Sequence, residues 1–411
     1  MQTFTGKQYL AIDIANSFGL DKENWGVRLA WFETNRATIE NAPFEDILVW
    51  AQQAEEPAQF LAGINAYRKV LLGHVTGYMC GLDATASGIQ LLSLLSGCPQ
   101  SASMCNLINT GDREDTYTSV HQHVNKLLGT AIVFARKAVK NATMTHFYGS
   151  KAVPRDTFGE DTPQLAAFYQ TIDELLPGAN TLNYDLISLW QPNVLSHEWT
   201  LPDGFDVKVK VMGSKEHQVE FLGSHHTVIE RVNECQEEGL SMGANIVHSI
   251  DGMIVREMGR RSMYDASVVY NAHHVLLNSP ARTSTLREQD LALLRTLECF
   301  DQSGFMSAVI FEHLDAANVG HLSPTHRQAT LALIESLPDR PFHLIAIHDC
   351  FKFHPNYGND VRQQYINILA ELADSEILSW IASQVTGRQI PVNKITPNLS
   401  TQIRQSEYAL S

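Results

Sequence analysis

Residues 344–351 read LIAIHDCF, and in this stretch the pair His348-Asp349 directly follows a short apolar run. A second stretch, GLDATASGIQ at residues 81–90, places Asp83 after another short apolar approach. Between them, KAVKNATMTHFYGSK at residues 137–151 has the pattern of a basic helix that ends beside a tyrosine. An acidic residue at the end of each of two apolar segments, with cations between them in the sequence, is an arrangement suited to nucleotidyl transfer.

The chemistry of that reaction explains why these residue types are needed. Nucleotidyl transfer uses two Mg²⁺ ions about 3.5–4 Å apart, which activate the attacking hydroxyl and steady the leaving pyrophosphate. Mg²⁺ takes carboxylate oxygens and keeps several waters, so two aspartates and the substrate phosphates suffice to hold it. Arg136 and Lys140 lie four residues apart on one helix face, where they can bind a triphosphate.

These motifs resemble the single-subunit RNA polymerases of phages and mitochondria. GLDATASGIQ is similar to the first palm motif of that family, ARKAVKNATMTHFYGSK (135–151) to its fingers-helix motif, and LIAIHDCF to its last palm motif. Four further stretches occur in family order: IANSFGLDK (14–22), DTYTSVHQHVNKLL (115–128), LPDGF (201–205) and NIVHSIDG (245–252). The resemblance runs from about Tyr9 to about Val361. One such motif is a weak signal, whereas seven in order are a strong one.

The resemblance implies an α+β, mainly helical fold: the palm and fingers of a family-A polymerase, lacking the N-terminal domain and thumb. Residues 1–99 are expected to form the N-terminal part of the palm with a helical insertion and the first catalytic motif. Residues 100–247 are expected to form the fingers, with the nucleotide-binding helix and a hairpin near 203–222. Residues 248–411 are expected to complete the palm, with the second catalytic motif and a helical insertion near 257–335 that resembles no part of the family.

Asp83 and Asp349 are the candidate catalytic metal ligands, and the backbone carbonyl of Ala84 is a further one. A lone aspartate at a strand end is more often a turn or cap residue. The paired motifs reverse that preference. The family usually has glycine at the position of Ala84, so this chain departs slightly from the pattern where the backbone must approach the metal.

Arg136, Lys140 and Tyr148 follow one helical stripe, and a solvated basic face is the ordinary explanation for its charges. The resemblance instead implies that both cations bind the incoming triphosphate and that Lys140 protonates the leaving pyrophosphate as a general acid. It also implies that Tyr148, which precedes Gly149, senses the sugar. Core packing is the ordinary alternative for this tyrosine.

Gly88 discriminates best between polymerase classes. Related DNA polymerases carry a bulky glutamate five positions after the first catalytic aspartate, which blocks a ribose hydroxyl, and glycine leaves that space empty. From the residues alone, a helix-start role for Gly88 has equal weight. The resemblance further implies that His248 hydrogen-bonds the ribose 2′-hydroxyl and that Tyr117 and Lys22 lie near the substrate.

The composition limits the class of protein and the cell compartment that are expected. The chain has 411 residues, enough for more than one core, and its six cysteines form no CxxC pair. No apolar run reaches the roughly 18 residues of a membrane span, so no membrane association is expected. The expected location is the cytoplasm of an infected bacterium. The net charge of −15 is unusual for a protein that binds nucleic acid, because phosphate binding needs cations.

Local signals predict several elements. Residues 1–82 are predicted to be helical, with one helix after Pro43 whose apolar face includes Phe44 and Leu48, and another that begins at Pro57. A buried helix is predicted near 89–95, and two helices are predicted over 100–150.

The acidic charge and the missing segments predict a second chain. An N-terminal domain, a thumb and a basic nucleotide-binding residue are expected ahead of Tyr9 in the family and are absent here. We therefore expect a heterodimer, similar to the two-chain RNA polymerase of N-four-like phages, in which this larger catalytic chain acts with a smaller subunit. DNA template, RNA product, ribonucleoside triphosphates, and a phage single-stranded-DNA-binding or promoter-opening factor are the other expected partners. A DNA polymerase or primase-like relative and a non-catalytic subunit with a polymerase fold stay open as alternatives.

Overall fold

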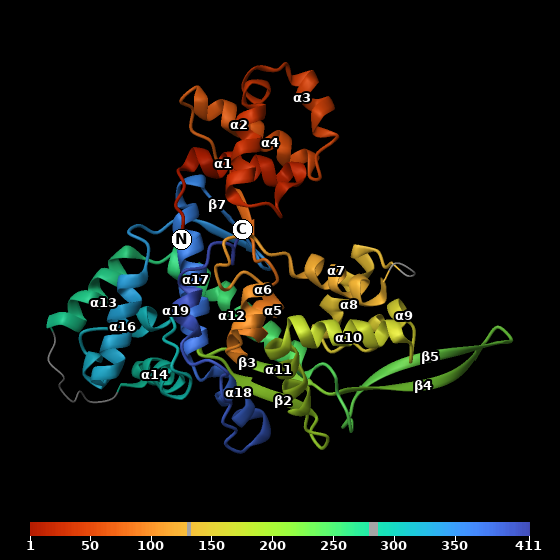
Figure 1. Cartoon of the computed structure of the whole chain (residues 1–411). Helices are drawn as coiled ribbons and strands as arrows, with labels where there is room; N and C mark the ends of the chain where they lie inside the picture. Colours follow the sequence, from red (N-terminus) through yellow and green to blue (C-terminus); the bar gives the residue numbers. More distant parts are fainter. Residues whose placement is uncertain (130–132, 279–286) are drawn as a thin grey trace.

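A small antiparallel sheet lies at the centre of a mainly helical molecule (Figure 1). The computed structural model describes residues 1–129, 133–278 and 287–411. The sheet has the order β1–β7–β6, formed by β1 (Cys80–Asp83), β7 (Cys350–Phe353) and β6 (Leu344–Ile347). It therefore joins two segments that are far apart in the chain. No helix in the described ranges is long and apolar enough to cross a membrane.

The N-terminal helices form one lobe beside this sheet: α1 (Gly6–Ala15), a π-helical turn η1 (Asn16–Leu20), α2 (Trp25–Asn41), α3 (Phe44–Ala51) and α4 (Pro57–Leu71). Thr5 and Gln8 form a capping box that starts α1, and Pro57 starts α4 as its sequence predicts. The predicted apolar face of α3 is only partly buried: Phe44 and Leu48 are exposed. The predicted helix is confirmed as α3, and these two side chains are exposed because α3 lies on the outside of the lobe.

The central helices build a second lobe: α5 (Ser87–Ser96), α6 (Pro99–Met104), α7 (Thr116–Leu128), α8 (Arg136–Phe147), α9 (Ala152–Phe158), α10 (Pro163–Leu175) and α11 (Pro177–Ser188). The buried helix predicted near 89–95 is confirmed as α5, which ends at Gly97 in the left-handed conformation. Two helices were expected over 100–150, and the structure adds the short α6, which Pro99 starts.

Two hairpins follow, where the sequence predicted one near 203–222. β2 (Ser196–Thr200) pairs with β3 (Asp206–Lys210) across the turn at 201–205. β4 (Met212–Phe221) pairs with β5 (Ser224–Asn233) in a separate ribbon. The predicted bounds are wrong, because β3 pairs backward with β2 and β4 pairs forward with β5, so the segment 203–222 spans parts of two hairpins.

The predicted insertion near 257–335 is helical and has a hydrophobic core of its own. α12 (Met242–Ser262) leads into α13 (Ala266–Asn278), α14 (Leu291–Ser303), α15 (Ile310–His313) and α16 (Pro324–Ser336). A buried ion network ties this unit to the centre. On α12, Arg261 bonds Glu257 at 3.1 Å and bonds Glu371 at 2.9 and 2.7 Å, and the Ala308 N–H donates to Glu257 at 3.1 Å.

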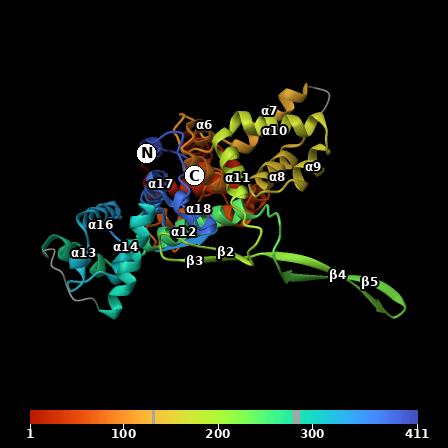
Figure 2. The same ribbon diagram turned by 90° about the horizontal axis from the view of Figure 1, so that it is seen from below.

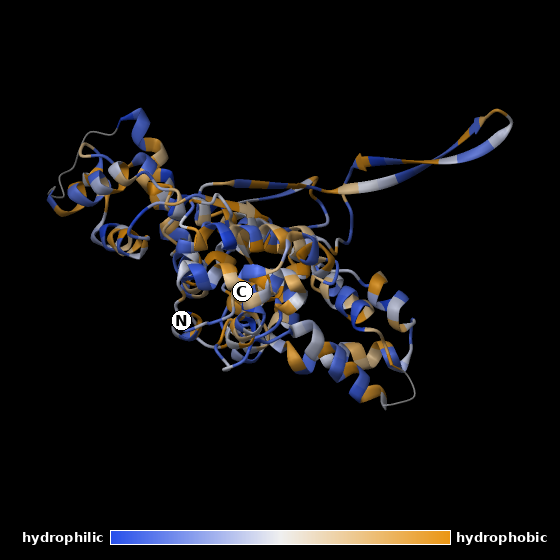
Figure 3. Ribbon diagram, turned by 90° about the horizontal axis from the view of Figure 1, so that it is seen from above, coloured by the Kyte–Doolittle hydropathy of each residue, from blue (hydrophilic) through white to orange (hydrophobic). Residues whose placement is uncertain are grey.

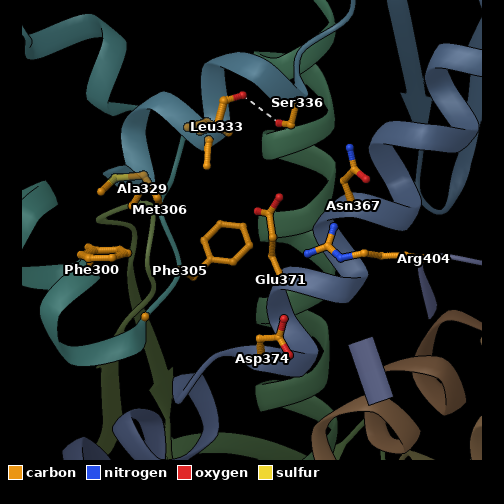
Figure 4. A pocket seen from close by; sticks show the side chains of 12 residues that line it. Phe300, Phe305, Met306, Ala329, Leu333, Ser336, Asn367, Glu371, Asp374 and Arg404 are labelled. Atoms are coloured by element: carbon orange, nitrogen blue, oxygen red, sulfur yellow. Dashed lines mark hydrogen bonds between the residues drawn. The ribbon is translucent and has the colours of Figure 1, made fainter. Parts of the chain in front are cut away.

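The chain ends with α17 (Gly358–Asp374), α18 (Ile377–Thr386) and α19 (Leu399–Ile403). A cavity of about 350 Å³ lies between α14, α16 and α17, away from both candidate aspartates. Figure 4 shows Phe305 and Leu333 on one side of it and Asn367 and Arg404 on the other. This cavity marks the junction between the insertion and the central core.

Candidate active site

The central sheet brings the two predicted catalytic aspartates together. Asp83 is the last residue of β1 and lies opposite Cys350 of β7. The backbone N–H of Ala84 donates to the carbonyl of Asp349 at 3.1 Å. His348 adopts φ 56° in the turn between β6 and β7, which lets Asp349 precede β7 directly. Residues far apart in the sequence thus become neighbours through antiparallel register alone.

The two carboxylates make the sheet end strongly electronegative. Burial raises the pKa of Asp349, and the charge of Asp83 raises this pKa further, although a hydrogen bond from Ser87 opposes both effects. Burial and then the charge of Asp349 raise the pKa of Asp251 to about 6. Burial and Asp83 also raise the pKa of the Cys350 thiol to about 12. Burial is the largest cause of all three pKa shifts, and the negative charge of a neighbouring aspartate adds to it.

A divalent cation fits this donor set. Neither Asp83 nor Asp349 forms an ion pair with lysine or arginine in the described part of the chain, so their repulsion is left for another cation to relieve. No group of three or more His, Cys, Asp or Glu side chains converges as a metal site among the described residues. Two carboxylates with waters and substrate oxygens nevertheless meet the preference of Mg²⁺ for hard oxygen ligands.

A cavity of about 220 Å³ opens beside Asp349 and collects most of the predicted nucleotide-binding residues. Its lining includes Ala84, Gly88, Tyr117, Lys140, Met144, Tyr148 and Asp349. Lys140 lies on α8 with its ammonium 5.3 Å from the centre of the Tyr117 ring. Val139 and Ala142 are buried on the opposite side of α8, so burial of that side turns the Lys140 face toward the cavity.

Three residues predicted to sense the sugar meet at one edge of this cavity. The rings of Tyr148 and His248 stack with centroids 4.8 Å apart and planes at 11°. A β-carbon added to Gly88 would meet the Tyr148 hydroxyl at 3.7 Å, an ordinary contact, so a longer side chain would point at this stack. Gly149 fixes Tyr148 at the end of α8: it has φ 81°, and an added β-carbon would lie 2.2 Å from the Leu240 carbonyl oxygen.

Two cations predicted to bind the nucleotide do not line this cavity. Arg136 is on α8 as expected, but its guanidinium bonds the Thr118 hydroxyl at 2.7 Å and forms an ion pair with Asp115, the N-cap of α7. Lys22 is exposed and pairs with its neighbour Asp21 at 3.3 Å. In this arrangement Arg136 joins two helices of the lobe, and neither cation reaches the cavity beside Asp349.

Asp83 lines a separate cavity of about 350 Å³, which contains residues that sequence reasoning missed. Arg113 lines it and donates from Nε to the Ser411 hydroxyl at 3.0 Å. The Ser411 N–H donates to the carbonyl of Asp83 at 2.9 Å. Nothing local in the sequence marks Arg113 or Ser411, because only the tertiary structure returns residue 411 to β1.

Comparison with known proteins supports a polymerase origin for the first part of the chain. Residues 3–158 match the family model described as DNA-dependent RNA polymerase. A Neurospora crassa protein named "Probable DNA-directed RNA polymerase" is 30% identical over 164 residues, 35% of this chain and 18% of that protein. The match thus spans about a fifth of the length of this curated relative. Residues 3–158, which contain Asp83, Lys140 and Tyr148, are therefore similar to part of the DNA-dependent RNA polymerase family.

Proposed function

We propose that this chain is the catalytic subunit of a DNA-directed RNA polymerase that adds ribonucleotides by a two-metal mechanism. The observation that carries the proposal is the meeting of Asp83, at the end of β1, with Asp349, in the turn before β7, beside a cavity lined by Lys140 and Tyr148. The first aspartate lies inside the segment that matches the polymerase family, and the second lies outside it. The sheet supplies the physical link between them.

Each residue has a separate role in the proposed reaction. Asp83, Asp349 and the Ala84 carbonyl would hold two Mg²⁺ ions, which when bound supply Lewis acidity and neutralise phosphate charge. Lys140 binds the triphosphate and donates a proton to the departing pyrophosphate. Its place against the Tyr117 ring keeps the ammonium in the cavity, since a cation is attracted to the face of an aromatic ring.

The sugar pocket favours ribonucleotides over deoxynucleotides. The space at Gly88 leaves room for a ribose hydroxyl, and Tyr148 and His248 present polar atoms next to that space. A DNA polymerase would gain from filling this space with a side chain. This arrangement makes DNA synthesis the less favoured of the two template-dependent reactions.

We infer that the active enzyme is a phage heterodimer in the host bacterial cytoplasm, similar to that of N-four-like phages. The net charge of −15 leaves few cations for a template and an RNA product, so the smaller subunit and a single-stranded-DNA-binding factor would supply them. Ile345 and Ile347 are exposed on β6, the outer strand of the central sheet. An exposed apolar outer strand beside the catalytic aspartate supports a covering chain.

A primer-extension assay tests the proposal. The chain, with its co-expressed partner and Mg²⁺, is given a primed DNA template and either ribonucleotides or deoxynucleotides. We expect extension with ribonucleotides, its loss on chelation, and its loss in Asp83→Asn. Extension only with deoxynucleotides would establish the DNA polymerase alternative. Template binding without any extension would establish a non-catalytic subunit.

A further inference from the structure

A polar stripe on α17 faces the helical insertion. Four polar residues at intervals of three and four share one side of this helix: Gln364, Asn367, Glu371 and Asp374. Opposite them, α14 and α16 present apolar side chains, and the two walls enclose the cavity of about 350 Å³ shown in Figure 4. Figure 2 shows α13, α14 and α16 as one group beside α17, and Figure 3 shows hydrophobic and hydrophilic residues mixed along these helices. The volume is in the range of about 300–1,000 Å³ that is typical of small-molecule sites.

The polar wall of this cavity has hydrogen-bonding capacity that the protein does not use. Asn367 is only 8% exposed, and its side-chain oxygen accepts a hydrogen bond from Gln363 at 2.9 Å. Its amide nitrogen has no partner in the part of the chain that the structure describes. One turn earlier on α17, the buried Oε1 of Gln364 is also without a partner, while the amide of the same side chain donates to the carbonyl of Ser336 at the cavity wall. Buried polar groups are nearly always paired, so this wall is suited to a polar occupant.

The rim of the cavity carries one guanidinium and one carboxylate that are not paired. Arg404, at the end of α19, and Asp374, at the end of α17, both line the cavity and are exposed. Within residues 1–129, 133–278 and 287–411, neither side chain forms a hydrogen bond or an ion pair. Lys394 lies near Asp374, but it donates to the carbonyls of Ala373 and Ser375. Both charges are therefore available to a molecule bound in the cavity.

The order of these polar groups indicates which ligand fits. Figure 4 shows the Arg404 side chain between Asn367 and Asp374, on the side opposite Phe305. The polar wall thus presents two hydrogen-bond donors followed by a carboxylate acceptor. A guanine ring has the complementary edge, with N7 and O6 as acceptors and with N1–H and the 2-amino group as donors. Phe305 and Phe300 supply aromatic surface against which a flat base can pack.

Other nucleotide groups match this wall less well. Adenine would place its 6-amino donor against Arg404, which also donates, and its N1 acceptor against the Asp374 carboxylate. A triphosphate needs several cations, and Arg404 is the single cation among the described residues that line the cavity. Glu371 adds a carboxylate there, and both of its oxygens already accept from Arg261, at 2.9 and 2.7 Å. The base, and not a phosphate chain, is therefore the group that this cavity can recognise.

We propose that the cavity between α14, α16 and α17 is a guanine-binding site for a nucleoside, separate from the site of nucleotide addition. Asn367 and Arg404 donate to N7 and O6 of the base, and Asp374 accepts from N1–H and the 2-amino group. None of the residues that line this cavity lines the cavity beside Asp349. The inference therefore does not depend on the proposed function. A bound nucleoside bridges the insertion and α17, so it also stabilises their contact.

Calorimetric titration of the full-length chain with guanosine, without divalent metal or template, tests the proposal. We expect guanosine to bind, and adenosine to bind at least roughly tenfold more weakly. Arg404→Ala should weaken guanosine binding by roughly ten- to hundred-fold, the range for a hydrogen bond from a charged group, and Asp374→Asn by roughly tenfold. The matched control is Arg388→Ala, which removes an exposed arginine away from the cavity and should leave binding unchanged. Lys140→Ala should also retain guanosine binding.

Each outcome of this titration supports or overturns the site. Absence of guanosine binding, or equal binding of guanosine and adenosine, overturns it. Binding that is lost in Lys140→Ala and retained in Arg404→Ala places the ligand at the site of nucleotide addition and overturns it as well. GTP that binds tenfold more tightly than guanosine contradicts recognition through the base. Thermal unfolding gives a second readout, because guanosine should raise the midpoint of wild type and not that of Arg404→Ala. Since no RNA is made in either measurement, failure of the proposed function does not affect them.

Discussion

The central sheet and the β4–β5 hairpin are both antiparallel β-structure, yet they are stabilised in opposite ways. Leu82, Phe351 and Phe353 in the sheet are buried in the main core, whereas every residue of the hairpin from 214 to 231 is exposed. The proposed reaction requires the sheet to hold two carboxylates in fixed relation, and burial provides that rigidity. Substitutions should therefore have large consequences in the body of the molecule and small ones in the hairpin.

The largest contrast is expected in catalysis. Asp83→Asn or Asp349→Asn should retain the fold and lower nucleotide addition by roughly a thousand-fold or more, because each removes a charged metal ligand. Glu220→Gln on the hairpin removes the same kind of charge and should leave the rate of primer extension nearly unchanged once the complex is formed. Near-normal extension by either aspartate variant would refute the metal-ligand assignment.

The next largest effect is expected on stability, from the buried ion network. Arg261 is fully buried between Glu257 and Glu371, so Arg261→Ala removes the buried cation they share and leaves Glu257 with Arg260 alone; it should cost about 3–5 kcal/mol of unfolding free energy. Lys215→Ala breaks a solvent-exposed pair with Glu234 at the base of the hairpin and should cost less than about 1 kcal/mol. Chemical denaturation of both variants measures the difference, and equal costs would contradict the comparison.

Glycines with positive φ sharpen the comparison further. Gly149→Ala places a β-carbon against the Leu240 backbone and should lower stability by roughly 2–5 kcal/mol, from strain and overpacking together. Gly223→Ala at the hairpin turn has a similar φ and nothing within 4 Å, so only the local strain is expected. Thermal unfolding should show a lowered midpoint for the first variant and little change for the second.

The raised pKa of Asp251 predicts that the stability of the fold depends on pH. Its pKa of about 6 in the folded protein exceeds the ordinary value of 3.8, so the native state holds a proton that the unfolded chain has released. Its contribution to stability is therefore complete below about pH 4 and is lost as pH rises through 6. Without divalent metal, Asp251→Asn should be more stable than wild type at pH 7–8, by on the order of 1–3 kcal/mol.

That gain should vanish below about pH 4, because Asp251 is then protonated in the native protein and is as neutral as asparagine. Glu216→Gln on the hairpin provides the comparison, and we expect its stability to follow wild type at every pH. A stability difference for Asp251→Asn that stays constant from pH 3 to 8 would show that burial and Asp349 do not control this group.

The smallest effect concerns the sugar. Tyr148→Phe deletes one hydroxyl next to Gly88 and keeps the stack with His248, so the preference for ribonucleotides should fall by up to about tenfold, the value of one hydrogen bond. Tyr270→Phe on the exposed face of α13 is the control and should leave the preference unchanged. Competing extension with both nucleotide classes measures the ratio, and equal ratios in wild type and Tyr148→Phe would remove the sugar-sensing role.

Local signals in the sequence predicted much of this fold. Pro57 and the apolar stretch near 89–95 correctly indicated α4 and α5, since caps and burial patterns depend on neighbours within a few residues. The bounds of the hairpins were wrong, and the spacing of Phe44 and Leu48 did not indicate that both side chains are exposed. Both points concern which neighbours cover a segment, because a period of apolar residues does not say whether anything lies opposite.

The candidate site, like the fold, was predicted from the sequence only in part. Motif order identified Asp83, Asp349, Lys140, Gly88, Tyr148 and His248, and the structure places them around one sheet end and cavity. Arg136 shows what the sequence could not predict. Its helical spacing placed it on the same stripe as Lys140, but an ion pair with Asp115 holds its guanidinium away from the cavity. Arg113 and Ser411 were missed because their place beside Asp83 depends on the last residues returning to β1.

The sequence by itself determined which residue types could perform nucleotidyl transfer, because carboxylates, a lysine and a glycine in ordered motifs are chemical requirements read locally. Only the tertiary structure decided that Asp83 and Asp349 meet at one end of the central sheet, that Arg136 joins α7 to α8, and that Leu222 lies at the tip of a projecting hairpin. The physical reason is that register, ion pairing and exposure depend on contacts between distant segments. Those contacts are fixed by burial of the whole core.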